Sequence, residues 1–229
     1  MTAQNKLLAV ALVAATCVVV PGYSAAGPVT IPNWDFSDGS SGFSSDYVNP
    51  ALSRMRSTLS SNGLLWPEDT YAVGTDPSLY HCLWPSLGDH TTGDGSMLIV
   101  NGSLYAGAIV WSATVDVLQY TRYDFSAWVT SVYADNPARV VFYINDLPLG
   151  APYDLSATTG LWQQFNAGWD SGAETTAVMS LVDLNTEAHG NDFGVDDIEL
   201  RTVPDGGTTL FLLGGALAGF ATLRRKLGT

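Results

Sequence analysis

Two neighbouring stretches in the middle of the chain alternate between apolar and polar residues. In 108–117 the apolar side chains fall on every second position, at Ile109, Trp111, Ala113, Val115 and Val117. The same spacing recurs in 120–133, at Tyr123, Phe125, Ala127 and Val129. Because successive side chains of a strand point to opposite faces, this period of two indicates strands with one buried face and one face in water.

The rest of 27–201 shows no helical period of useful length, and 51–61 offers at most one short helix. Short alternating runs, separated by Gly, Pro, Asn and Asp, predict strands at 70–73, 97–101, 108–117, 120–133, 139–145, 162–169, 173–183 and 192–201. About eight strands with turn signals between them are typical of an all-β fold, a single antiparallel β-sandwich over residues 27–202. We find no internal repeat and no second domain.

The charge of the chain is strongly negative and unevenly placed. The 229 residues carry a net charge of −13, and between Gly27 and Thr202 the only basic residues are five arginines. An acidic domain of this kind disfavours nucleic acid or anionic lipid as a partner. It suits an exported soluble domain, or one that takes up divalent cations.

The N-terminal residues 1–26 have the pattern of a secretory signal peptide. A short basic start is followed by the apolar run LLAVALVAATCVVV and by small residues at Ser24, Ala25 and Ala26. This order predicts export through the Sec machinery with cleavage near Ala26. An uncleaved anchor is the alternative, and lipidation at Cys17 is a weaker one. Cys82 would then be the one thiol of the domain, expected to be a buried apolar residue.

The last residues combine a short extended segment, an apolar run and a basic end. Residues 208–223 contain no charge; a helix of that length spans about 24 Å, slightly less than a hydrocarbon core of roughly 30 Å. Arg224, Arg225 and Lys226 would keep its end in the cytoplasm. A membrane helix fits this run better than a buried core helix, because the run has no polar face.

The motif before this run narrows its interpretation. Val203, Pro204, Asp205, Gly206 and Gly207, followed by the apolar run and the basic end, resemble the VPDSG-type variant of bacterial PEP-CTERM sorting signals, with Gly206-Gly207 where that pattern has Ser-Gly. The resemblance implies a membrane-anchored precursor that an exosortase processes, followed by release or attachment at the cell surface. A plain single-pass anchor is the alternative.

The order of motifs in the domain resembles the galactose-binding-like jelly rolls of secreted bacterial proteins, which include carbohydrate-binding modules. The motifs are IPNWDFSDGSSGF, DGSMLIVNGS, VWSATVDV, YDFSAWV, VVFYINDLPLG, LWQQFNAGWDSG and GNDFGVDDIEL, over residues 31–201. This architecture implies a fold more than a function, because it serves sugar binding, adhesion and purely structural roles.

The resemblance also implies a structural calcium site between the first and last strands. Its candidate ligands are Asn33, Asp35, Asp38, Asp196 and Asp197, and Ca²⁺ prefers such oxygen ligands. Ser37 stands where the family pattern has a glutamate. The alternative is that one carboxylate of the Asp196–Asp197 pair caps a turn or pairs with an arginine while the other is solvated.

Seven tryptophans suggest sugar stacking, since aromatic faces offer large contact areas. Trp111, Trp162 and Trp169 are expected to be packing residues, and Trp128, out of phase with its buried neighbours, is expected to face outward.

The irregular 62–107 region holds the aromatic residues predicted to form an exposed platform, namely Trp66, Trp84, Tyr80 and Tyr105. The alternative is a second small hydrophobic cluster under a long loop. Asp89, His90 and Asp94 could orient a sugar beside them or serve as turn residues.

Enzyme chemistry finds little support in the sequence. His81, His90 and His189 lack metal-ligand spacing, and no Gly-x-Ser-x-Gly motif occurs. We therefore predict an exported, non-catalytic surface or extracellular-matrix protein. Its domain binds polysaccharide, or serves as a purely structural or adhesive component; a glycosidase built on two carboxylates is a more remote alternative.

Overall fold

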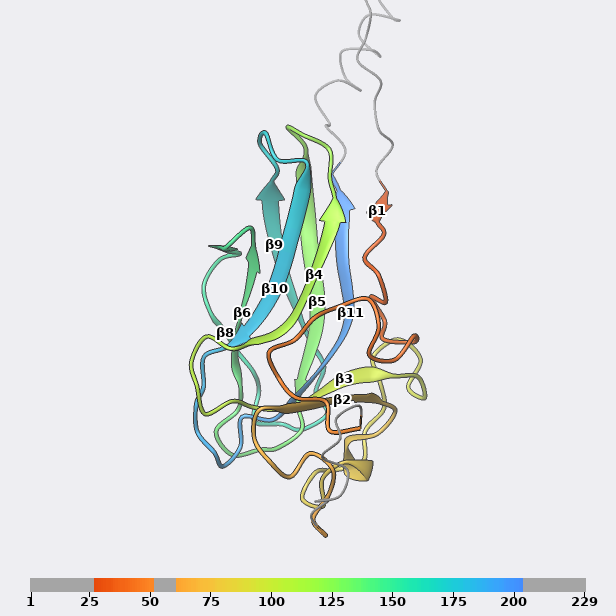
Figure 1. The fold of residues 1–229 in the computed structure, drawn as a ribbon, viewed down its shortest axis with the longest axis vertical. Coiled ribbons are helices and arrows are strands. Elements are labelled where there is room, and N and C mark those ends of the chain that lie inside the picture. Colours follow the sequence, from red (N-terminus) through yellow and green to blue (C-terminus); the bar gives the residue numbers. More distant parts are fainter. Residues whose placement is uncertain (1–26, 52–60, 204–229) are drawn as a thin grey trace, which may run out of the picture.

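The computed structural model describes residues 27–51 and 61–203, which form two antiparallel sheets packed face to face (Figure 1). The predicted signal peptide, residues 52–60 of the expected short helix, the predicted membrane helix and the basic end lie outside the described residues. Of the sorting motif, only Val203 lies inside them. No helix in the described ranges is long and apolar enough to cross a membrane.

The first sheet, sheet A, contains the last strand of the domain near its centre. Its order is β2 (Thr70–Gly74), β3 (Met97–Asn101), β11 (Phe193–Thr202), β5 (Arg122–Ser131) and β9 (Gln163–Asp170). The short strand β1 (Pro28–Val29) pairs with the C-terminal half of β11, beyond the point where β3 pairs with it. One edge of β11 is therefore shared between β1 and β3, while β5 follows its other edge.

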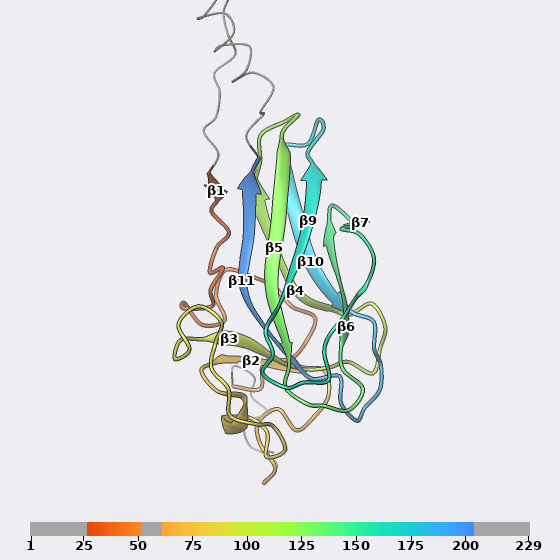
Figure 2. The ribbon, with the colours of Figure 1, turned by 180° about the vertical axis from the view of Figure 1, so that it is seen from behind.

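The second sheet, sheet B, is formed by β4 (Ile109–Asp116), β10 (Thr176–Asp183), β6 (Arg139–Ile144) and β7 (Leu147–Pro148). Strand β8 (Tyr153–Asp154) also pairs with β6. Seen from behind, β11, β5 and β9 lie in front of β4 and β10 (Figure 2). All pairings between the named strands are antiparallel, and an isolated parallel bridge joins Val48 to Thr70 of β2.

The eight strands predicted from alternation are confirmed, each within a few residues of its expected ends. The two-residue strands β1, β7 and β8 and the one-turn 3₁₀ helix η2 (Pro77–Leu79) were not predicted, because elements this short have no period to detect. The all-β class and the antiparallel sandwich therefore follow from the sequence pattern.

The main core lies between the sheets and is built from the alternating residues. Trp111 of β4 and Phe142 of β6 are almost fully buried, as are Tyr123 and Phe125 of β5. Trp169 of β9 packs on Tyr123. These contacts confirm Trp111 and Trp169 as packing residues.

A second, smaller cluster lies under the 61–107 region. This is the end of the sandwich where the paired strands β2 and β3 lie across the direction of the long strands (Figure 1). Its buried members are Leu65, Ala72, Trp84, Met97, Ile99 and Val132, with Tyr80, Leu87, Tyr133 and Trp162 partly buried against them. The alternative of a small cluster under a long loop is thus confirmed for part of this region.

Candidate functional site

The outer face of sheet A carries a shallow cavity of about 230 Å³, which we call the outer groove. It is lined by Trp34, His90, Thr91, Ser126, Trp128, Gln164, Asp197 and Glu199. Ser126 and Trp128 come from β5 and Gln164 from β9, and Trp128 pairs directly with Gln164. The prediction that Trp128 faces outward is confirmed, because its neighbours Ala127 and Val129 are in the core.

A bulge in β11 gathers carboxylates on this face. Asp196 pairs with Trp128 and Glu199 with Ser126, so the register shifts between them, and Asp197 adopts a positive φ of 49°. The extra residue places both Asp197 and Glu199 on the outer face that Asp196 also occupies, while Ile198 is buried in the core. Regular alternation would have turned Asp197 and Glu199 to the same side as each other but away from Asp196.

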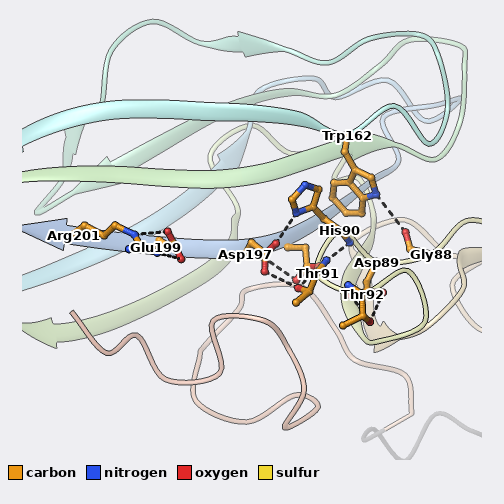
Figure 3. A network of polar contacts seen from close by, with 10 residues as sticks. Gly88, Asp89, His90, Thr91, Thr92, Trp162, Asp197, Glu199 and Arg201 are labelled. Atoms are coloured by element: carbon orange, nitrogen blue, oxygen red, sulfur yellow. Dashed lines mark hydrogen bonds and ion pairs between the residues drawn. The ribbon is translucent and has the colours of Figure 1, made fainter. Parts of the chain in front are cut away.

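The loop 88–95 is held onto this face by Asp196 and Asp197, and Figure 3 shows Asp197 beside His90 and Thr91. Asp196 Oδ2 accepts hydrogen bonds from the backbone N–H groups of His90 and Thr91, at 2.9 and 3.1 Å, and from the Thr91 hydroxyl. Asp197 Oδ1 accepts from the same hydroxyl at 2.6 Å, and Asp197 Oδ2 lies 2.6 Å from His90 Nδ1. Burial raises the pKa of Asp196 to about 6, with a further contribution from Asp197.

His90 is fixed by aromatic rings as well as by these bonds. Its ring stacks on Trp128, with centroids 3.8 Å apart and an interplanar angle of 16°, and it meets the edge of Trp162 at 5.8 Å. Trp162 Nε1 donates to Gly88 O at 3.3 Å, which confirms Trp162 as a packing residue. His90 therefore forms one rigid wall of the groove.

The other residues of the loop are turn residues. Asp89 is buried, and its carboxylate accepts from the backbone N–H groups of Thr92 and Gly95 at 2.9 and 2.7 Å. Of the three polar neighbours named from the sequence, Asp89 supports the turn, His90 lines the groove and Asp94 is exposed.

Glu199 is held in place along β11 by a bidentate ion pair. Arg201 Nε and one terminal nitrogen each donate to a different Glu199 oxygen at 2.7 Å (Figure 3). This guanidinium lowers the pKa of Glu199, so its carboxylate is ionised in the groove at neutral pH. Trp34, at 38 % exposure, stands beside β11, since Ile198 N donates to Trp34 O at 3.0 Å.

That backbone bond brings together the two segments predicted to hold calcium, but the side chains of Asn33, Asp35, Asp196 and Asp197 have other partners. Asn33 Nδ2 donates to Gly39 O at 2.7 Å, and Asp38 N donates to Asn33 Oδ1. Asp35 accepts from both the N–H and the hydroxyl of Ser37, the residue that replaces the family glutamate.

Asp196 supports the 90–91 turn, as the alternative foresaw for one carboxylate of the pair, but Asp197 pairs with His90 and is not solvated. The described ranges contain no group of three or more His, Cys, Asp and Glu side chains arranged to hold a metal ion. Calcium at Asn33, Asp35, Asp38, Asp196 and Asp197 remains a prediction.

The aromatic platform predicted in 62–107 does not form as expected. Trp84, expected to be exposed, is 4 % exposed, because it packs in the second cluster and its Nε1 donates to Asp192 Oδ2 at 3.0 Å. Tyr80 is half-buried over the same cluster, with its hydroxyl on Val73 O. The prediction of exposure is therefore wrong for Trp84, and Tyr80 is largely a packing residue.

Trp66 and Tyr105 are exposed, as predicted. Trp66 stacks on His81 at 4.9 Å, and His81 in turn stacks on Trp84 at 4.6 Å. Cys82, in the turn between these rings, is exposed and its thiol is free, so the prediction of a buried cysteine is wrong. In this turn the side chains of His81 and Trp84 point inward and are buried, and that of Cys82 points outward.

Trp66 lies at a second cavity, which we call the end pocket, of about 220 Å³. The lining residues are Trp66, Glu68, His81, Leu83, Asn101, Tyr133, Ala188, His189, Gly190 and Asp192. Tyr105 is not among them. Sequence reasoning missed this pocket because its polar residues come from four segments far apart in the chain.

Comparison with known proteins supports two parts of the sequence interpretation. Residues 202–227 match the VPDSG-CTERM motif. The C-terminal segment is thus a VPDSG-CTERM sorting signal. No curated protein sequence shows a significant match to the chain.

The sandwich itself is similar in fold to solved structures of low sequence identity. A Stig cyclase, FisC from Fischerella sp. TAU, solved with a pyrrolidinylidene-indole, is 12 % identical with a TM-score of 0.53, covering 79 % of this chain and 99 % of that one. The tandem CBM22 domains of Paenibacillus barcinonensis Xyn10C are 13 % identical with a TM-score of 0.50, covering 82 % of this chain and 49 % of the tandem. At these identities the likeness concerns the fold alone.

Proposed function

We propose that this chain is an exported surface protein whose galactose-binding-like jelly roll binds an extracellular polysaccharide, without catalysis, in the outer groove. The VPDSG-CTERM signal at 202–227 indicates a chain delivered outside the cell and handled by a processing enzyme. In this proposal residues 1–26 direct Sec export, residues 208–223 hold the precursor in the membrane, and an exosortase acts near Val203–Gly207.

The observation that carries the binding proposal is the combination of side chains in the outer groove. Trp34 offers an exposed aromatic face of the kind that packs against the C–H face of a sugar ring, and the stacked rings of Trp128 and His90 line the same groove. Asp197, Glu199 and Gln164 supply acceptors, and Gln164 also supplies donors, between those rings. Pockets that combine apolar faces with a few convergent polar groups are typical ligand sites.

The protonation of the carboxyl groups in and beside the groove supports sugar binding over hydrolysis of the sugar. A glycosidase needs a carboxylic acid that is protonated near neutral pH beside an ionised one. Glu199 is held ionised by Arg201, which lowers its pKa. Asp196, the carboxyl next to the groove whose pKa is raised, is buried under loop 88–95 and is occupied by its hydrogen bonds. These features fit polar recognition of hydroxyl groups.

The proposal is tested by glycan-array screening of the purified protein followed by titration calorimetry on the best polysaccharide. Trp34→Ala and Gln164→Ala remove exposed groove contacts, and each is expected to weaken binding about tenfold or more, the loss typical of a central contact. Trp66→Ala, at the end pocket, is the matched control and is expected to bind as the wild type does.

Each other outcome has a defined meaning. Binding that survives both groove variants but is lost in Trp66→Ala would move the sugar site to the Trp66 surface first suggested by the sequence. Absence of binding to any glycan, with the protein folded, would favour the purely structural or adhesive role. Release of reducing ends from a bound polysaccharide would overturn the non-catalytic assignment.

A further inference from the structure

Three buried oxygen atoms without hydrogen-bond partners belong to residues that line the end pocket. They are Glu68 Oε2, Asn101 Oδ1 and Asp192 Oδ1. Asn101 is 3 % exposed and Asp192 is 6 % exposed. Buried polar atoms nearly always have a hydrogen-bond partner, so three unpartnered oxygens around one cavity indicate that a bound group is missing there.

In Asn101 and Asp192 the other polar atom of the side chain is already in use, which fixes the orientation of the free oxygen. Asn101 Nδ2 donates to Leu65 O at 2.7 Å, and Asp192 Oδ2 accepts from Trp84 Nε1 at 3.0 Å. Asn101 and Asp192 are therefore each anchored by one polar atom and leave the other unpartnered. All three unpartnered atoms are oxygens that accept or coordinate, so the missing partner is a donor or a cation.

The charge around the pocket favours a cation over a neutral donor. Among the described residues that line it, none is Lys or Arg. Burial raises the pKa of both Glu68 and Asp192 to about 7, and the proximity of Asp192 adds to the effect on Glu68. Asp69 acts on Glu68, and Asp183 on Asp192, in the same direction. Ionised carboxylates this close are stable only with a compensating charge.

We propose that the end pocket binds one hard divalent cation, Ca²⁺, through the free oxygens of Glu68, Asn101 and Asp192, with water in the remaining positions. Carboxylate and amide oxygens in an incomplete, adaptable set suit Ca²⁺ better than Mg²⁺ or a softer metal. Two carboxylates and one amide do not amount to a group of three His, Cys, Asp and Glu ligands, in keeping with the absence of such a group from the described residues.

This site is separate from the calcium site predicted from the sequence and has a different structural effect. Glu68 precedes β2, Asn101 ends β3 and Asp192 precedes β11. A cation bound by these three residues would cross-link the 61–69 loop, the end of β3 and the 184–192 loop at one end of the sandwich. It would bind the folded state alone, and so raise the free energy of unfolding by mass action.

The test is calcium titration calorimetry and thermal unfolding of the purified mature protein, first stripped with EDTA. The wild type is expected to bind one Ca²⁺ and to melt at higher temperature with Ca²⁺ than without, with Mg²⁺ much less effective. Glu68→Gln, at a half-buried position, is expected to weaken Ca²⁺ binding tenfold or more. Asp192→Asn keeps an acceptor for Trp84 and is expected to remove most of the shift in melting temperature.

Asp35→Asn and Asp197→Asn are the controls, because they alter the site between the first and last strands, and both are expected to bind Ca²⁺ as the wild type does. Terbium luminescence gives a second readout, since Trp66 lines the pocket and sensitises a bound Tb³⁺; Trp66→Leu should dim the emission without displacing Ca²⁺.

Three results would overturn the proposal. The first is no Ca²⁺ binding and an unchanged melting temperature after chelation. The second is binding that survives Glu68→Gln and Asp192→Asn but is lost in Asp35→Asn or Asp197→Asn, which would place the ion at the sequence-predicted site. The third is an equal rise in melting temperature with Mg²⁺ and with Ca²⁺, which would contradict a site that prefers Ca²⁺.

Discussion

The imidazole of His90 lies flat against the indole of Trp128, with ring centroids 3.8 Å apart. His90 belongs to a loop and Trp128 to the outer face of β5, so this stack joins an irregular segment to the sheet that it covers. The same imidazole lies 2.6 Å from an Asp197 oxygen. One side chain thus couples the aromatic and the acidic parts of the outer groove.

Replacing His90 should therefore affect both stability and the groove. In His90→Ala the stack and the Asp197 contact are lost, and the free energy of unfolding is expected to fall by about 1–2 kcal/mol, the usual cost of a partly buried contact residue. Polysaccharide affinity should fall as well, because one wall of the groove is no longer fixed. His189→Ala, at a mostly exposed histidine, is the control. Equal melting temperatures for the two variants would contradict this role of His90.

Trp84 is expected to act through its indole nitrogen as well as through its size. Trp84→Phe keeps most of the apolar contact in the second cluster but removes the donor to Asp192 Oδ2. A buried acceptor that loses its partner costs about 1–3 kcal/mol. Urea unfolding measures this loss, with Trp66→Phe as the exposed counterpart, expected within about 0.5 kcal/mol of the wild type. A similar small change for Trp84→Phe would show that Asp192 has found another donor.

Asp183 should make the stability of the domain depend on pH. Burial raises the pKa of its carboxyl group to about 7, from 3.8. The folded state thus holds this proton more tightly than the unfolded state. The stabilisation is complete below about pH 4 and is lost as the pH rises towards 7. Asp183→Asn keeps an oxygen for the N–H groups of Arg139 and Asn185.

With EDTA present, the melting temperature of Asp183→Asn should exceed that of the wild type at pH 7.5, and the difference should shrink at pH 4.5. Asp154→Asn, at an exposed carboxylate, serves as the control. A difference that does not vary with pH would refute the titration of Asp183 in this range.

The domain should remain folded without the sorting signal. The final contacts described are Thr202 N to Gly27 O at 3.1 Å and Val203 N to Arg122 O at 2.9 Å. A chain ending at Val203 keeps both, so its melting temperature is expected within about 2 °C of the longer protein, the shift that corresponds to less than 1 kcal/mol at this size.

Mass spectrometry of the protein exported by its native cell should find a C-terminus upstream of Thr208. A mature protein that still carries the chain through Lys226 would show that residues 203–226 act as a simple membrane anchor.

Sequence patterning predicted the long strands because burial between two sheets imposes a period of two, as in Trp111 and Val115 of β4. The same reasoning placed Trp128 on the outer face. It failed for Trp84 and Cys82, since the 61–107 region folds over a small cluster of its own and its turns follow no period.

The groove and the end pocket were harder to foresee. Asp197 reaches the groove only through a bulge that breaks the alternation of β11, and His90 reaches Trp128 only through a loop. Glu68, Asn101 and Asp192 are brought together by strand order, which a single sequence does not reveal. The C-terminal signal was readable because it depends on composition and order alone.

The position of β11 would have a mechanical consequence in a chain that is held at its C-terminal side. The chain leaves the described domain after β11, beside β1 and at the opposite end from η2 (Figure 1). Tension applied at Val203 would pull β11 along its own length, between β5 on one edge and β1 and β3 on the other. Because antiparallel hydrogen bonds lie perpendicular to the strands, they would be loaded together in shear and not opened one at a time. A pull at Val203 would thus act on a strand that is paired along both edges, at the end of the sandwich opposite η2.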